Sequence, residues 1–154
     1  FAVVILTNTT YSMKRQHSNH TLPKEKGLKN KKMNDATYKQ RREVMDCIYK
    51  IKNHLREQGY RLPRINVRIT EPQKAETPLG VGRASTCTIW IPTDVLSGGN
   101  YHRYLFHVVA HEILHAAYAV GHNKKCRLMH PNAQRNSDEE VLRIFTNYVK
   151  KRSK

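Results

Sequence analysis

The residues with the clearest capacity for chemistry are His111, Glu112 and His115, the polar positions of the segment His-Glu-Ile-Leu-His. Histidines at i and i+4 lie on one face of a helix, so both imidazoles can reach the same metal ion. A glutamate beside the first histidine can take a proton from a water molecule held by that metal. The spacing therefore predicts a metal site with a general base next to it.

The segment is embedded in mostly apolar sequence that extends from Leu105 to Ala117. A helix that is apolar around most of its circumference is a buried one. Buried histidine and glutamate side chains are costly unless they have partners. An HExxH match also occurs by chance on ordinary helices, but the apolar surroundings favour a metal site here, because a metal supplies the missing partner.

A third ligand is needed, because a catalytic zinc ion has three protein ligands and an open fourth position. The strongest candidate is His122, directly after Gly121, where a positive φ would let the chain leave the helix and turn back to the metal. Five other side chains remain as alternatives: His130, Cys126, Asp138, Glu139 and Glu140.

His107 and His130 are candidate accessory residues. His107 lies one turn before His111 on the same helix face, and as a fourth ligand it would close the site. We expect it instead to form a hydrogen bond with a backbone or carboxylate group in the core, since buried polar groups have such partners.

The segment from His111 to Pro131, with Cys126-Arg127-Leu128-Met129-His130-Pro131 at its end, resembles the metzincin class of zinc endopeptidases, the matrixins and astacins in particular. Their signature is HExxHxxGxxH, followed by a tight turn that contains a methionine beneath the metal. The resemblance implies that His111, His115 and His122 bind Zn²⁺, that Glu112 is the general base and that Met129 is the Met-turn residue.

The same resemblance implies how a peptide or protein substrate would bind. The strand before the active-site helix lines the metzincin cleft, and an extended substrate would pair antiparallel to its edge. The matching residues here are Thr88, Ile89 and Trp90. The segment after the Met-turn, residues 132–136, would shape the pocket beyond the metal.

The chain departs from the metzincin signature at one place. His122 lies seven residues after His115 instead of six, Tyr118 takes the position of the glycine, and Gly121 precedes the histidine. The fourteen residues from His115 to Met129 still fit the matrixin pattern. One residue is therefore shifted from the following loop into the end of the helix.

Two other functions remain open. HExxH followed by Gly-His and a Leu-Met segment is also similar to the SprT-like and Wss-type proteases, which cut proteins crosslinked to DNA. The interval from His115 to His122 is shorter than in those proteases, and a Met-turn explains Met129 better. A basic structural or packaging protein that keeps a zincin scaffold is the non-enzymatic alternative, although such a scaffold does not require Glu112.

The length of 154 residues suits one domain, and the pattern predicts an α+β fold over residues 35–154. The resemblance implies that this is a minimal zincin fold. We expect a small mixed sheet packed on a long N-terminal helix and on a central active-site helix capped by Asn100, then a Met-turn and a C-terminal helix. Val44, Ile48, Ile51 and Leu55 mark the buried face of the first helix, which ends at Gly59. Ser137 and Glu140 form a capping box for the last.

Residues 1–34 are expected to form a basic arm, or a strand and a loop. The net charge is +16, and the segment from Lys14 to Lys32 contains seven basic residues and one acidic residue, Glu25. Such a charge favours nucleic acid or an anionic assembly surface as a partner, the alternative being a solubility feature. No apolar run is long enough for a membrane helix and Phe1–Leu6 lacks a basic flank, so we expect a soluble protein of open compartment.

Overall fold

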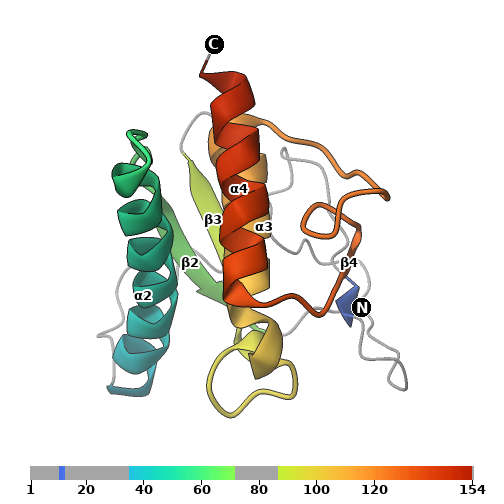
Figure 1. Cartoon of the computed structure of the whole chain (residues 1–154). Coiled ribbons are helices and arrows are strands. Elements are labelled where there is room, and N and C mark those ends of the chain that lie inside the picture. The colour runs from blue at the N-terminus through green and yellow to red at the C-terminus, as the bar shows by residue number, and fades with distance from the viewer. Residues whose placement is uncertain (1–10, 13–34, 72–86, 154) are drawn as a thin grey trace.

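The computed structural model describes residues 11–12, 35–71 and 87–153. Over these residues three α-helices pack around a two-stranded parallel sheet, which confirms the α+β class (Figure 1). The helices are α2 (Asp35–Glu57), α3 (Leu105–Tyr118) and α4 (Asp138–Arg152). The strands are β1 (Tyr11–Ser12), β2 (Asn66–Thr70), β3 (Thr88–Pro92) and β4 (Asn132–Ala133).

Helix α2 forms where its apolar periodicity predicted it. Val44, Ile48, Ile51 and Leu55 are at most 5% exposed and pack into the core. Gly59 follows the helix with a φ of 87°, a conformation that costs glycine little, and its N–H donates to the carbonyl of Arg56. The expected end of the helix is therefore confirmed.

The sheet beside α3 differs from the expected mixed sheet. Within the described residues it has two strands, and they run parallel, with Val67 opposite Ile89. Every residue of β3 is buried, as is usual when a parallel strand is covered on both faces. Helix α3 packs against β3, and α2 packs against both β2 and α3. The sheet thus places the buried side of α3 in the centre of the fold.

Helix α3 begins later and ends earlier than the sequence indicated. Its first residue is Leu105, after the short 3₁₀ helix η3 (His102–Tyr104), so the prediction that Asn100 caps it is wrong. It ends at Tyr118, and Ala119 takes the left-handed conformation with a φ of 54°. The predicted positive φ at Gly121 is also wrong, because the chain has already turned at Ala119.

Helix α4 is anchored at its start as the capping pattern predicted. The Ser137 hydroxyl accepts a hydrogen bond from the N–H of Glu140 at 3.1 Å. Val141, Phe145 and Val149 are buried in the core, and the helix packs along α3 (Figure 1). The reciprocal half of the capping box does not form as expected: the Glu140 carboxylate pairs with Arg143.

Part of the N-terminal segment joins the domain. Strand β1 pairs antiparallel with β4, with Tyr11 opposite Ala133, so two residues of the expected arm add to the segment after Met129. The remainder of residues 1–34, including the cationic stretch from Lys14 to Lys32, lies outside the described residues.

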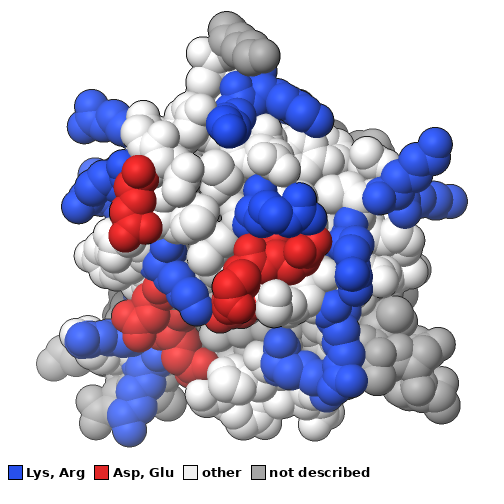
Figure 2. Space-filling model, viewed as in Figure 1, with Lys and Arg blue, Asp and Glu red and all other residues white. Residues whose placement is uncertain are grey.

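The excess of positive charge is widely distributed. In the view of Figure 2, Lys and Arg side chains lie on every side of the molecule and in its middle, whereas Asp and Glu lie in the middle and on the left. Among the helices that the structure describes, none has the length and apolar character needed to cross a membrane.

Candidate metal centre

Three of the predicted ligands come together at the C-terminal half of α3. The Nε2 atom of His111 lies 3.0 Å from Nε2 of His115 and 3.2 Å from Nε2 of His122. His111 and His115 are buried, whereas His122 is exposed and comes from the segment after the helix. The three form a group that could hold a metal ion, with one side open to solvent.

Backbone carbonyls fix the two buried rings. Nδ1 of His111 lies 2.8 Å from the carbonyl oxygen of Leu128, and Nδ1 of His115 lies 2.6 Å from that of Val120. A carbonyl oxygen only accepts hydrogen bonds, so each Nδ1 carries the proton and donates it. In the neutral form of each imidazole, Nε2 is then the unprotonated nitrogen. Such contacts orient histidine ligands in metal sites.

This arrangement suits a cation and is unfavourable without one. The unprotonated Nε2 atoms of His111 and His115 face each other with their lone pairs 3.0 Å apart. Zinc–nitrogen bonds of 2.0–2.1 Å at a tetrahedral angle place two nitrogen ligands about 3.3 Å apart. The two separations from His111, 3.0 and 3.2 Å, are close to that edge length, and all three ligand atoms lie within 4.8 Å of one another. Neutral imidazole nitrogens suit zinc, copper, iron and nickel, so the donor set identifies a class of metals and no single one.

The buried environment keeps the imidazole of His111 neutral at neutral pH. Burial lowers the pKa of His111 well below its usual 6.5, and the neighbouring His115 lowers it further. The hydrogen bond with Leu128 acts in the opposite direction but is outweighed. A metal ion therefore does not have to displace a proton from His111 at neutral pH.

The turn after α3 delivers His122 to the site. Ala119 reverses the chain in the left-handed conformation, and the N–H of Val120 donates to the carbonyl of Leu114 at 3.1 Å. The N–H of Asn123 then donates to the carbonyl of Met129 at 2.9 Å. This contact closes a loop that holds His122 and the Leu128 carbonyl near the same pair of rings.

The predicted Met-turn residue is fully buried. Met129 is 0% exposed, and its N–H donates to Sγ of Cys126 at 3.4 Å. The preceding residue, Leu128, supplies the carbonyl that orients His111. The segment thus has a direct structural connection to the histidine group. Residue types did not reveal this connection, because the two orienting carbonyls, of Val120 and Leu128, are backbone groups.

The alternative ligands have other contacts and are not members of the histidine group. Nδ1 of His130 accepts from the N–H of Asn132 at 3.0 Å, and Asp138 pairs with Lys50 on α2 at 2.6 Å. Glu140 pairs with Arg143. Cys126 and Glu139 likewise lie outside the group.

His107 also lies outside the group and contacts a side-chain amide, where we expected a backbone or carboxylate group. Its Nδ1 lies 3.1 Å from Nδ2 of Asn136, which donates, and its ring stacks 6.3 Å from that of His111. Burial, and then the charge of His130, lower the pKa of His107 to about 4. The ring is therefore neutral at neutral pH.

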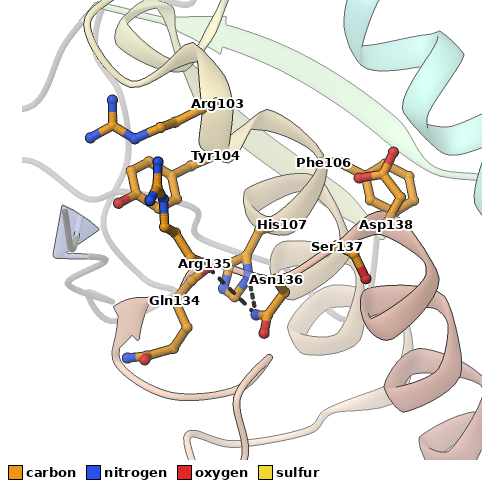
Figure 3. Close-up of a pocket in the computed structure, with 9 residues that line it drawn as sticks. All are labelled: Arg103, Tyr104, Phe106, His107, Gln134, Arg135, Asn136, Ser137 and Asp138. Atoms are coloured by element: carbon orange, nitrogen blue, oxygen red, sulfur yellow. Dashed lines mark hydrogen bonds between the residues drawn. The ribbon is translucent and has the colours of Figure 1, made fainter.

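His107 and Asn136 line a pocket of about 330 Å³, and His107 is the lining residue whose ring stacks on that of His111. Figure 3 shows the Arg103 and Arg135 side chains on the same side of the pocket, with Gln134 below them. The segment expected to shape the pocket beyond the metal therefore does line a pocket, through residues 134–136.

Glu112 and the expected substrate strand are buried. Glu112 is 2% exposed on α3, next to His111, and a carboxylate in such a position is costly without a function or a partner. Thr88, Ile89 and Trp90 are 7%, 0% and 7% exposed in β3, which packs against α3. On one edge they pair with residues 66–68 of β2.

A scan against protein-family models and searches of curated proteins and of solved structures found no match to this chain. The site must therefore be interpreted from its own geometry.

Proposed function

We propose that the protein is a zinc-dependent endopeptidase that hydrolyses peptide bonds. The observation that carries the proposal is the convergence of the Nε2 atoms of His111, His115 and His122, two of them held in the unprotonated state by backbone carbonyls. Glu112 adjoins this group on the same buried helix. Three imidazole ligands beside a carboxylate match the requirements of a hydrolytic zinc site.

The chemistry divides between the metal and the chain. A zinc ion held by the three imidazoles would lower the pKa of a water molecule towards about 7 and polarise the scissile carbonyl. Glu112 takes the proton from the attacking water and delivers it to the leaving amine. His122, the exposed member of the group, leaves the solvent side of the site accessible to a peptide.

The residues expected to pair with the substrate, Thr88, Ile89 and Trp90 of β3, are buried, so the surroundings offer the substrate one accessible position. The pocket lined by His107 and Asn136 would take a substrate side chain, since the ring of His107 lies 6.3 Å from that of His111. Arg103 and Arg135 at this pocket favour an acidic or polar side chain.

The proposal is tested with purified protein, measured zinc content and cleavage of an unstructured protein such as casein. Wild type should bind one zinc ion and cleave casein, and chelation followed by zinc addition should abolish and restore cleavage. Glu112→Gln should keep the zinc and lose cleavage, because the amide cannot accept the proton. The magnitude expected from a missing general base is about 10²–10⁴-fold.

The matched control is Glu139→Gln, which makes the same chemical change on a residue outside the histidine group. It should leave both zinc content and cleavage unchanged. Stoichiometric zinc without hydrolysis in the wild type would contradict the proposal and favour the scaffold function. Full activity of Glu112→Gln would show that the carboxylate has no part in the reaction.

A further inference from the structure

One side of α2 carries aromatic and cationic side chains that the metal centre does not use. Tyr38 and Tyr49 are 58% and 53% exposed, and they are the exposed large hydrophobic residues of the described part of the chain. At 100° per residue, Tyr38, Tyr49 and three exposed cations fall within about 80° of arc. We name these five residues the α2 stripe: Tyr38, Arg42, Tyr49, Lys52 and Arg56.

Three of the acidic residues of the helix, Glu43, Asp46 and Glu57, lie apart from this stripe. Asp46 and Glu57 fall on the neighbouring arc of the helix, about 60° or more from its two tyrosines. Glu43 is further round, where its carboxylate accepts from the N–H of Ser97 and contacts His102. The α2 stripe therefore has a local charge of +3 without an acidic residue within it.

The composition of the stripe identifies its ligand chemistry. Cations attract a phosphate backbone, and exposed aromatic rings offer faces on which bases stack. Tyr38 and Tyr49 are separated by eleven residues, or about 16 Å along the helix axis. That distance corresponds to about five nucleotides at 3.4 Å per nucleotide of one strand. We propose that the α2 stripe binds single-stranded nucleic acid, with bases on the two tyrosines and phosphates on the three cations.

This surface is separate from residues 1–34, which are expected to form a basic arm. It is also separate from the metal centre, because α2 presents its buried face to α3 and the stripe lies on an exposed arc. A negative result for the stripe would therefore leave the proposed peptidase activity untouched.

The test is fluorescence anisotropy of the full chain with labelled oligothymidylate and oligouridylate. The probes are longer than a site of about 4–16 nucleotides. Tyr38→Ala with Tyr49→Ala should weaken binding about tenfold or more, because stacking on both rings is lost. Replacement of both tyrosines by phenylalanine should restore most of the affinity, whereas leucine should not, since it lacks an aromatic face.

The cations are tested through the salt dependence of binding. Arg42→Gln with Arg56→Gln should lower the slope of log affinity against log salt by about 1.4, or 0.7 for each lost phosphate contact. The matched control, Lys150→Gln with Lys151→Gln on α4, removes the same charge outside the stripe and should change the slope much less.

Comparison of the affinities for oligothymidylate and oligouridylate shows whether the stripe prefers single-stranded DNA or RNA. Equal weakening by the α2 and α4 charge variants would overturn the proposal, because binding would then follow net charge alone. Unchanged affinity of the double alanine variant, or equally tight binding of a duplex, would also overturn it, because stacking needs unpaired bases.

Discussion

His122 offers the most informative single perturbation, because it is an expected metal ligand that is also exposed. Truncation of an exposed side chain usually changes the free energy of unfolding by no more than about 0.5 kcal/mol. We therefore expect His122→Ala to have nearly the same stability as the wild type in the presence of a chelator. The difference should emerge only when zinc is added.

The size of the zinc-dependent change in stability follows from the linkage between metal binding and folding. With free zinc at about a thousand times the wild-type Kd, binding adds about 4 kcal/mol of stability. Changes around a metal ligand weaken affinity about 10–100-fold, and loss of the ligand itself should have at least the larger effect. The zinc-dependent gain of His122→Ala would then fall to about 1.4 kcal/mol. At roughly 3 °C per kcal/mol, the Tm rise on zinc addition should shrink by about 8 °C.

The assay is thermal unfolding of wild type and His122→Ala, each with chelator and with excess zinc. His54→Ala is the matched control, because it removes a partly exposed histidine of α2 that is not part of the histidine group. It should keep the full zinc-dependent rise. An unchanged zinc response in His122→Ala would refute the geometry, since the third Nε2 atom would then not contribute to metal binding.

Two further predictions concern stability and pH. Ala119→Gly should raise the free energy of unfolding by about 1 kcal/mol in urea titrations, since glycine adopts a φ of 54° without strain. Ala117→Gly within α3 should lower it by about 1 kcal/mol, and equal losses in both variants would contradict the left-handed turn. Because the pKa of His107 is lowered from 6.5 to about 4, the unfolded chain binds a proton between these values that the folded chain does not. The free energy of unfolding should therefore fall by about 3 kcal/mol, through His107 alone, as the pH falls from 6.5 to about 4. In the zinc-free protein, His107→Gln should make this decline with pH less steep.

The sequence was sufficient where a local pattern determines the structure. The spacing of Val44, Ile48, Ile51 and Leu55 indicated the buried face of α2, because these residues must meet the core on one side. His111 and His115 share a helix face for the same geometric reason. The hydroxyl of Ser137 caps α4 as its residue type predicted.

Prediction from sequence was insufficient where the structure is determined by contacts between distant segments of the chain. The parallel pairing of β2 and β3 joins segments distant in the chain, and the pattern of either strand does not encode it. The turn at Ala119 was missed because an alanine in the left-handed region is strained and gives no local signal. The carbonyls of Val120 and Leu128 were missed because every residue has such a group, and only the folded chain brings these two to the imidazoles.

The most direct test of the metal centre is zinc X-ray absorption spectroscopy of the purified, zinc-loaded protein. The geometry of His111, His115 and His122 predicts three imidazole nitrogens at about 2.0–2.1 Å, with one oxygen completing the shell. A sulfur scatterer at about 2.3 Å would instead place Cys126 on the metal, and a fourth imidazole would close the open position. Either result would contradict a hydrolytic site built from these three histidines.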